Sequence, residues 1–485
     1  MLQLLPPDDC RRLIGFFSSA GYTFEALNST KLIERASHRY GTVRFLLENT
    51  AEPSPFNTLA RWFAIGVAVP AETAAQQLPD WVIALLIDSG MLCQAEHQFQ
   101  PKVMLSPLGT MLIASDPVLK WEDDPDDLVL WPNPTTEQLF QFTVRKPFRS
   151  GLDLGCGCGV HALAAASHCE SVVATDLNPR AAEFTSFNAR LNGIANVECA
   201  TGDAFHPVAG RTFDLIVANP PFFITPGSNL MFCENNLDLD LFCRRLVQEA
   251  PQHLNESGFF QMVCEWVEIE GQPWRERVSE WLDSSGCDAW VIRQYTLGAS
   301  KYGAERAQQR PPASEAAYES FLSGWIAYAH QNKIVAVHGG LIALRKRSGR
   351  NWVRIEEEPV SLDGPIGDLI LAGFETRDLL DSTAGDALLN LSPRLAPDAR
   401  LVQLFAPGDA GWNPQRLRLQ LTGARPRQID VDPGVAQFIG RLNGTAKLGE
   451  LIQDLATRSG APLERVMPES MGVIRKLLAE GYLEI

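Results

Sequence analysis

A glycine-rich segment of this chain has the residue types of a cofactor-binding loop. Residues 153–159 read DLGCGCG, close a strand predicted at Gly151–Leu154 and precede a predicted helix. Gly155 and Gly157 would let the backbone approach a ligand without Cβ clashes. A dinucleotide fingerprint would need a third glycine at position 160, where the chain has Val160. The spacing fits D-x-G-x-G-x-G instead, so we expect a loop that holds S-adenosylmethionine (SAM), with Asp153 facing its ammonium group directly or through water.

Two further acids stand where SAM would need them. Asp176 ends the next apolar run, and a carboxylate there can accept both ribose hydroxyls. Asp203 follows the third run and can accept from the adenine amino group. A strand-end acid alone is often a helix cap, so the order of loop, first acid and second acid carries the prediction. The predicted SAM-binding residues are Asp153, Gly155, Cys156, Gly157, Gly159, Asp176, Leu177, Asp203, Ala204 and Asn219, and S-adenosyl-L-homocysteine would be the product.

The tetrapeptide Asn219-Pro220-Pro221-Phe222 follows another buried run and is predicted to be catalytic. Ligands of doubly wound sheets bind beyond the carboxyl ends of the strands, so it should border the methyl group of SAM. The Asn219 side-chain oxygen and the Pro220 carbonyl can each accept one N–H of a planar NH2 group, which orients the nitrogen lone pair. Phe222 or Phe223 offers a ring on which a planar base or amide can stack. This pattern predicts methylation of an amino nitrogen, governed by positioning.

Other residues are candidates for contact with the methyl acceptor. Basic side chains late in the catalytic domain, including Arg345 and Arg347, could line a groove that follows phosphates. They could equally lie on an edge strand, where Lys and Arg prevent pairing with other sheets. Residues 223–238 are expected to form a substrate loop that orders on binding. The predicted substrate-binding residues are Phe222, Phe223, Thr136, Arg345 and Arg347.

Alternating strands and helices are expected to position these residues. From residue 150 the pattern predicts an α/β fold with a Rossmann-like, seven-stranded, mainly parallel, doubly wound sheet. Helices followed by a short hairpin predict a winged-helix-like module on each flank, and an acidic linker is expected at 122–127. The predicted divisions are an N-terminal winged-helix-like module at 1–120, a SAM-dependent methyltransferase domain at 121–348, an irregular or β linker region at 349–430 and a C-terminal winged-helix-like module at 431–485.

Length and composition narrow the class of protein. The chain has 485 residues, of which 45% are hydrophobic and 21% charged, as in an ordinary globular protein. No apolar run approaches the roughly 18 residues that a membrane span needs, so we expect no membrane partner. The formal net charge of -16 argues against coating of nucleic acid by bulk charge but leaves room for a local basic groove.

The ten cysteines are expected to be reduced thiols that serve as small, buried side chains, which favours a cytoplasmic protein. None follows Cys287, so they do not form a framework along the chain. Cys156 and Cys158 have no second Cys pair or spaced His pair with them, so no metal site is predicted.

These motifs resemble those of the small-domain class I methyltransferases with an N-P-P-[FY] motif. The resemblance covers about residues 130–347 and is carried by residues 152–159, 176, 203 and 219–222. The group includes ribosomal RNA guanine and adenine N-methyltransferases, DNA adenine methyltransferases and release-factor glutamine methyltransferases. Residues 131–137, WPNPTTE, are similar to the P-R-P-[ED]-T-E segment of the glutamine enzymes, with departures at Asn133 and Thr135. Phe222, in place of Tyr, is closer to the RNA-modifying members.

The resemblance implies a SAM-dependent N-methyltransferase that acts on an adenine or guanine amine in ribosomal or other RNA. The alternative acceptor is a protein glutamine. A non-enzymatic alternative is a SAM-binding scaffold or sensor, but it would not need an amine-orienting Asn219. The partner would be an RNA or a protein, and the C-terminal module is a candidate contact for a partner or a dimer.

Overall fold

The computed structural model describes residues 2–29, 41–117, 127–226, 237–309, 315–357, 364, 366–382, 385–409 and 411–485. The chain divides into two compact units. The larger unit comprises residues 1–140 and 145–359, and the smaller unit comprises 141–144 and 360–485. Most of the predicted acidic linker at 122–127 lies outside the described residues. No helix in the described ranges is long and apolar enough to cross a membrane.

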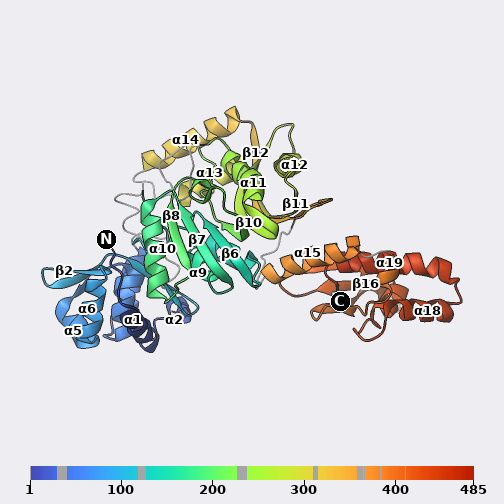
Figure 1. The fold of residues 1–485 in the computed structure, drawn as a ribbon, viewed down its shortest axis with the longest axis horizontal. Coiled ribbons are helices and arrows are strands. Elements are labelled where there is room, and N and C mark those ends of the chain that lie inside the picture. Colours follow the sequence, from blue (N-terminus) through green and yellow to red (C-terminus); the bar gives the residue numbers. More distant parts are fainter. Residues whose placement is uncertain are drawn as a thin grey trace. The chain divides into compact units, whose positions relative to one another are not determined.

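An eight-stranded sheet forms the centre of the larger unit (Figure 1). Its order is β13-β11-β12-β10-β9-β6-β7-β8, and β12 alone runs antiparallel to its neighbours. The Rossmann-like α/β prediction is confirmed, with an eighth strand, β13, beyond residue 348. The strands are β6 (Phe148–Leu154), β7 (Cys169–Asp176), β8 (Val197–Thr201), β9 (Phe213–Ala218), β10 (Leu254–Ile269), β11 (Cys287–Gly298), β12 (Ile334–Lys346) and β13 (Val353–Glu357).

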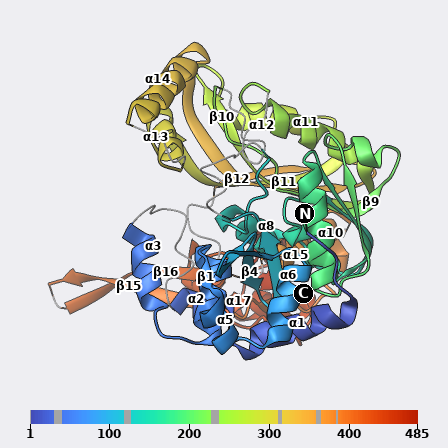
Figure 2. The same ribbon diagram turned by 90° about the vertical axis from the view of Figure 1, so that its left-hand side faces the viewer.

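Helices cover this sheet because its central strands are apolar on both faces. Leu215 and Ile216 of β9 are neighbours in sequence, point to opposite faces, and are both fully buried. Figure 2 shows α13 and α14 together at one end of the unit, and both pack on β12. The helices are α8 (Pro134–Phe142), α9 (Val160–Ala165), α10 (Pro179–Leu191), α11 (Leu241–Glu249), α12 (Trp274–Leu282), α13 (Ala299–Gln309) and α14 (Glu315–Gln331), with short 3-10 turns η3 (His206–Val208) and η4 (Ala250–His253).

The N-terminal part of the larger unit places helices before a small antiparallel sheet. Phe17, Trp62 and Phe63 are fully buried in its core. The helical elements are α1 (Pro7–Ser19), α2 (Phe24–Ser29), α3 (Gly41–Asn49), α4 (Pro55–Ala60), the π-helix η2 (Arg61–Ile65), α5 (Ala71–Gln77) and α6 (Asp80–Asp88). The strands are β1 (Val69–Pro70), β2 (Leu92–Ala95), β3 (Gln98–Pro101), β4 (Met104–Leu108) and β5 (Met111–Ser115). The order agrees with the predicted module, whose winged-helix character stays a prediction.

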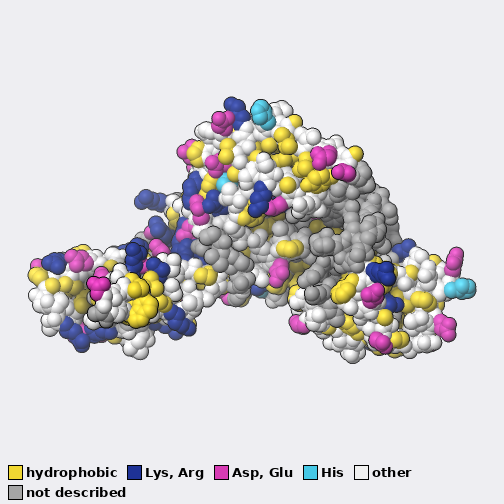
Figure 3. Space-filling model, turned by 180° about the vertical axis from the view of Figure 1, so that it is seen from behind, with side chains coloured by type: hydrophobic (Ala, Val, Ile, Leu, Met, Phe, Trp, Pro, Cys, Tyr) yellow, Lys and Arg dark blue, Asp and Glu magenta, His cyan; other side chains and the backbone are white. Residues whose placement is uncertain are grey.

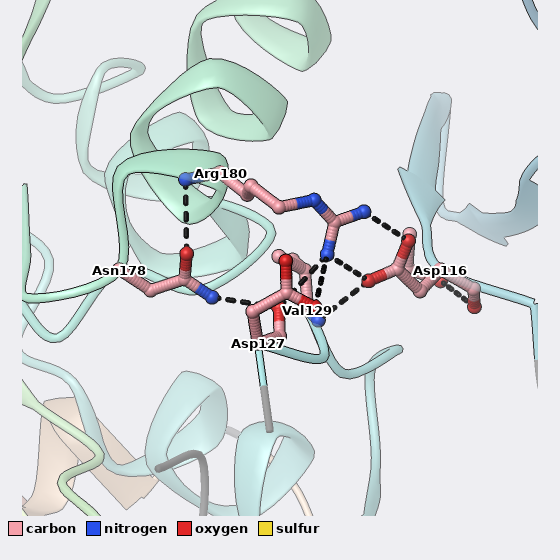
Figure 4. A network of polar contacts seen from close by, with 6 residues as sticks. Asp116, Asp127, Val129, Asn178 and Arg180 are labelled. Atoms are coloured by element: carbon pink, nitrogen blue, oxygen red, sulfur yellow. Dashed lines mark hydrogen bonds and ion pairs between the residues drawn. The ribbon is translucent and has the colours of Figure 1, made fainter. Parts of the chain in front are cut away.

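This N-terminal part is attached to α10 through polar side chains. The Asn188 side chain accepts from the Ala114 N–H and donates to the Ala114 carbonyl, each at 2.8 Å. Arg180 reaches the Asp116 carboxylate with both terminal nitrogens, at 2.8 and 2.6 Å (Figure 4). The Asn178 side chain donates to the Asp127 carbonyl at 2.8 Å in the same network. The helix that follows Asp176 therefore also anchors the N-terminal part.

The smaller unit has its own core, built from helices and an antiparallel three-stranded sheet in the order β15-β16-β17. The range predicted as a C-terminal winged-helix-like module, 431–485, contains the helices α17, α18 and α19, and its winged-helix character stays a prediction. The outer half of the β15–β16 hairpin is exposed, with Trp412 72% exposed. The elements are α15 (Ile366–Ser382), α16 (Gly385–Leu388), β14 (Arg394–Leu395), β15 (Ala399–Gly408), β16 (Gly411–Leu421), β17 (Arg427–Val431), α17 (Pro433–Ile439), α18 (Leu448–Ser459), α19 (Leu463–Ala479) and β18 (Leu483–Glu484).

Candidate functional site

The register of the parallel strands brings the predicted motifs to one edge of the sheet. Leu154 of β6 lies opposite Thr175 of β7 and Ala218 of β9. The residues that follow these three positions are the glycine loop, Asp176 and Asn219. Because neighbouring strands are about 4.8 Å apart, these motifs are adjacent at the carboxyl edge.

The glycine loop has a conformation that demands glycine. Gly155, Gly157 and Gly159 have φ angles of 78°, 52° and 85°, in the left-handed region. A Cβ at Gly155 or Gly157 would meet nothing within 4 Å, so there is open space beside the backbone there. A Cβ at Gly159 would lie 2.8 Å from Thr185 of α10. The first two glycines therefore leave room for a ligand, whereas the third lets the loop pack on α10.

Asp153 presents a buried carboxylate oxygen without a partner. Its side chain is fully buried, and Oδ2 accepts the Ala162 N–H at 2.8 Å. In the described part of the chain, Oδ1 has no hydrogen-bond partner. Burial raises the pKa of Asp153 to about 7, against the lowering effect of the Ala162 N–H. A cationic ligand group would satisfy this oxygen, which fits the ammonium group of SAM.

Asp176 keeps acceptor capacity at the end of β7. Its Oδ2 accepts the Gly157 N–H at 2.9 Å and its Oδ1 accepts the Asn178 N–H at 2.8 Å. Each carboxylate oxygen has two lone pairs, so each can still accept one hydroxyl. The next residue, Leu177, is 58% exposed, an unusual fraction for a large apolar side chain beside a loop. Asp176 and Leu177 together suit a nucleoside, because its ribose carries hydroxyl groups and its base is flat.

Asp203 has a partner that the sequence pattern did not reveal. Its Oδ2 lies 3.0 Å from Nη1 of Arg245 in α11, and Arg245 also pairs with Glu249 at 2.8 Å. Ala204 follows Asp203 with a φ of 45°. Arg245 lies 42 residues from Asp203, on an amphipathic helix whose polar face looks like ordinary solvated surface. The ion pair fixes the orientation of the Asp203 carboxylate.

The tetrapeptide leaves β9 with Asn219 partly exposed. Within the described ranges, the Asn219 side-chain amide has no hydrogen-bond partner. Phe222 is only 8% exposed, and its ring lies 5.5 Å from that of Phe223 in an edge-to-face arrangement. Phe223 is half-buried. Of the two predicted stacking rings, Phe223 is therefore the one with more exposed surface.

Thr136 lies in the first turn of α8 and is largely buried. Asn133 caps this helix, because its Oδ1 accepts the N–H groups of Thr135 and Thr136, each at 3.0 Å. The Thr136 hydroxyl donates to the same oxygen at 3.2 Å. The departure from the P-R-P-[ED]-T-E pattern at Asn133 thus has a local structural cause. A substrate role for Thr136 stays a prediction.

The structure does not bring Arg345 and Arg347 to this edge, which corrects the predicted basic groove. Strand β12 runs antiparallel to β10, so its last residues lie where β10 begins, and Arg345 is opposite Phe259. Arg345 is buried and pairs with the buried Asp288 at 2.7 Å, and Arg347 lies 3.5 Å from the same carboxylate. Arg345 is also not on an edge strand, because β12 has neighbours on both sides, and Arg347 follows directly after β12. On the face drawn in Figure 3, basic and acidic side chains are intermingled.

The predicted substrate loop at 223–238 is described only in part, since residues 227–236 lie outside the described residues. No cluster of three or more His, Cys, Asp or Glu residues suited to a metal ion is found in the described ranges.

The sheet order, the single antiparallel strand and the glycine loop define a class I methyltransferase fold. Residues 133–268 match the family described as the methyltransferase small domain, and residues 372–484 match the Domain of unknown function (DUF7782). The release factor glutamine methyltransferase of Aquifex aeolicus is 30% identical over 193 residues, which are 34% of this chain and 67% of that protein. The chain therefore belongs to the methyltransferase small domain family, whose members use SAM.

Two other relatives differ in the acceptor that their names state. The release factor glutamine methyltransferase of Vibrio cholerae is 36% identical over 149 residues, 27% of this chain and 51% of that protein. The ribosomal RNA small subunit methyltransferase C of Idiomarina loihiensis is 31% identical over 141 residues, 28% of this chain and 39% of that protein. The chain thus spans about half the length of the first of these relatives and less of the second.

Proposed function

We propose that the protein is a SAM-dependent N-methyltransferase that acts on a planar amino group. The observation that carries the proposal is the alignment of three strand ends, in which the glycine loop after β6 lies between Asn219 after β9 and Asp176 at the end of β7. Asp153 and Asp176 would hold the ammonium and ribose groups, and SAM would supply an electrophilic methyl group. Asp203, oriented by Arg245, would accept from the adenine amine.

The tetrapeptide would prepare the acceptor nitrogen. Its lone pair is delocalised, so the nitrogen is a poor nucleophile until its N–H groups are held. The Asn219 oxygen and the Pro220 carbonyl would accept these two N–H groups and aim the lone pair at the methyl carbon. The acceptor nitrogen would take the methyl group that SAM supplies, with S-adenosyl-L-homocysteine as the leaving group, and would then lose a proton. No strong base is required, because the nitrogen becomes acidic once it carries the methyl group.

A protein glutamine is the favoured acceptor. The two arginines expected to contact an RNA backbone, Arg345 and Arg347, lie at the other end of the strands, near the start of β10. Both are paired with Asp288. Relatives named as glutamine methyltransferases match this chain at 30–36% identity. A carboxamide presents the same planar NH2 group as a nucleobase but brings no phosphates that would need cationic partners.

An exocyclic amine of adenine or guanine in RNA is the second candidate. It is supported by the similarity to the ribosomal RNA methyltransferase and by Phe223, whose partly exposed ring could stack on a base.

Tritium-labelled SAM distinguishes these acceptors. The purified protein is incubated with [methyl-3H]SAM and an extract from a strain that lacks the gene, and the products are separated into protein, RNA and DNA. We expect label in protein that acid hydrolysis releases as methylamine, as from an N-methylated amide. Label confined to RNA would establish the second candidate, and absence of label from all fractions would contradict the enzymatic proposal.

A further inference from the structure

The chain that leaves the tetrapeptide is held by residues from another part of the sequence. The Arg306 guanidinium of α13 lies over the ring of Phe223, with Cζ 3.8 Å from the ring centroid. The next backbone N–H, that of Ile224, donates to the hydroxyl of Tyr302 at 3.0 Å. Both contacts come from α13, which follows β11. One helix therefore fixes two consecutive residues just after Phe222.

A buried glutamate joins these contacts. Glu265 of β10 is fully buried and forms an ion pair with Arg306, whose side chain is 9% exposed. The Tyr302 hydroxyl donates to Glu265 Oε2 at 2.5 Å, and the Tyr295 hydroxyl donates to Oε1 at 2.6 Å. The carboxylate thus receives donors on both oxygens. We call Glu265, Tyr295, Tyr302 and Arg306 the brace.

Glycine in the intervening strand makes the brace possible. Tyr295 of β11 and Glu265 of β10 both lie opposite Gly339 of β12, which separates them. A Cβ at Gly339 would stand 2.1 Å from Tyr295 Cζ. Only glycine therefore leaves the space through which the Tyr295 ring crosses β12. A register shift in β11 between Arg293 and Tyr295 sets the ring at this position.

The protonation states agree with this geometry. Burial and the charge of Glu265 raise the pKa of Tyr295 and of Tyr302 well above the usual value, so both remain donors. Burial would lower the pKa of Arg306, but Glu265, Tyr302 and Tyr295 together outweigh it and raise the pKa, so the guanidinium stays charged. A buried ion pair of this kind stabilises a fold weakly at best, because both charges lose their hydration. We therefore attribute the role of the Glu265–Arg306 ion pair to the geometry that it imposes on its neighbours.

We propose that the brace positions the tetrapeptide for methyl transfer, with Tyr302 and Arg306 as positioning residues that act through Ile224 and Phe223. This inference rests on the proposed function of Asn219. The cation on Phe223 fixes the orientation of that ring, and the hydrogen bond to Ile224 fixes the backbone two residues after Phe222. A displacement of about 1 Å in such a loop costs on the order of a hundredfold in rate.

The test compares Tyr302→Phe with Tyr22→Phe. Tyr22 is an equally buried tyrosine of the N-terminal part, and its hydroxyl donates to the Leu105 carbonyl at 2.8 Å, remote from the tetrapeptide. Initial rates of tritium transfer to the deletion-strain extract are measured over a range of SAM concentrations. For Tyr302→Phe we expect the maximal rate to fall about tenfold or more while the KM for SAM changes less than about twofold. Tyr22→Phe should retain the wild-type rate.

Hydrogen exchange provides a readout that needs no acceptor. Pro220 and Pro221 have no amide hydrogens, so the exchange of a peptide over residues 219–224 reports chiefly Phe222, Phe223 and Ile224. We expect faster exchange in Tyr302→Phe than in the wild type or in Tyr22→Phe. If the wild type transfers no methyl group, the proposed function fails, while this exchange still tests the brace.

Equal maximal rates and equal exchange in Tyr302→Phe and the wild type would overturn the inference. Should Tyr302→Phe not fold, Arg306→Lys decides, since it keeps the charge opposite Glu265 and removes the planar group on Phe223. We expect the same loss of maximal rate with an unchanged KM for SAM, and a wild-type rate in Arg306→Lys would contradict the role of the stacked guanidinium.

Discussion

Asp153 is the site residue whose chemistry depends most directly on burial. Its pKa is raised to about 7, whereas the unfolded chain would have the ordinary value of about 3.9. The folded protein without ligand therefore binds a proton more tightly than the unfolded chain does. This difference makes the contribution of Asp153 to stability fall as the pH rises from about 4 to 7. A bound ammonium group would favour the ionised carboxylate of Asp153 and would therefore weaken its proton binding.

We predict that SAM binds more tightly as the pH rises through the pKa of Asp153. At pH 6 most of this carboxyl is protonated, whereas at pH 7.5 most of it is ionised and attracts the ammonium group. The Kd for SAM should fall about five- to tenfold between these values. Titration calorimetry at the two pH values measures it, and proton release in buffers of different ionisation enthalpy identifies the coupled proton.

Asp153→Asn is the matched control for this pH dependence. It keeps the shape of the side chain and its contact with Ala162 but carries no titratable group. We expect weaker binding that is nearly independent of pH between 6 and 7.5. An unchanged pH dependence in this variant would show that another group is responsible.

Helix α10 is the element on which the site and the N-terminal part both depend. Its first residues follow Asp176, Thr185 packs on Gly159, and Arg180 and Asn188 hold the N-terminal part. The Asp116 side chain is only 3% exposed and Arg180 neutralises it. Removal of one member of such a pair leaves an uncompensated charge in a buried place.

We predict that Arg180→Ala destabilises the larger unit by about 3 kcal/mol, because Asp116 loses its partner. Arg44→Ala is the control, since Arg44 and Glu48 form an exposed pair whose loss should cost less than about 0.5 kcal/mol. Urea denaturation followed by tryptophan fluorescence compares the two. Equal losses of stability in the two variants would contradict the prediction that the Arg180–Asp116 pair stabilises the larger unit.

Strand patterns could be predicted wherever apolar runs are continuous. β9 (Phe213–Ala218) is such a run, and it is the buried run predicted before Asn219. β13 was not predicted as a strand because its Val353–Glu357 sequence is largely charged and lies at the edge of the sheet. Arg345 looked like surface because its charge is visible in the sequence, whereas its partner, Asp288, is 57 residues away.

The residues of the candidate site also differ in whether the sequence could predict them. The glycine loop, Asp176 and Asn219 could be predicted, because each directly follows an apolar strand and the parallel register aligns the ends. The brace could not, because Glu265 meets Tyr295 only across β12, by a register shift and the space left by Gly339, and because its other partner, Arg306, is 41 residues away. No local pattern carries information of that kind.

At the scale of the whole molecule, the predicted SAM site lies entirely in one of two units with separate cores. We predict two transitions in differential scanning calorimetry, of which SAM raises only the one from the larger unit. At a free concentration of a hundred times its Kd, SAM would add about 2.7 kcal/mol to the free energy of unfolding of that unit and would raise its Tm by about 4 °C. A single transition that moves as a whole would show that the units unfold together.

The central claim is that Asn219 orients an amino group for transfer of a methyl group from SAM. The most direct test is the initial rate of tritium transfer by Asn219→Ala, with Asn196→Ala as the control. The Asn196 side chain donates to the carbonyls of Ala166 and Cys169, at 3.0 and 2.9 Å, and has no place in the predicted site. We expect Asn219→Ala to keep SAM binding through Asp153 and Asp176 and to transfer about a hundredfold more slowly, with Asn196→Ala near the wild-type rate. A wild-type rate in Asn219→Ala would contradict the catalytic assignment.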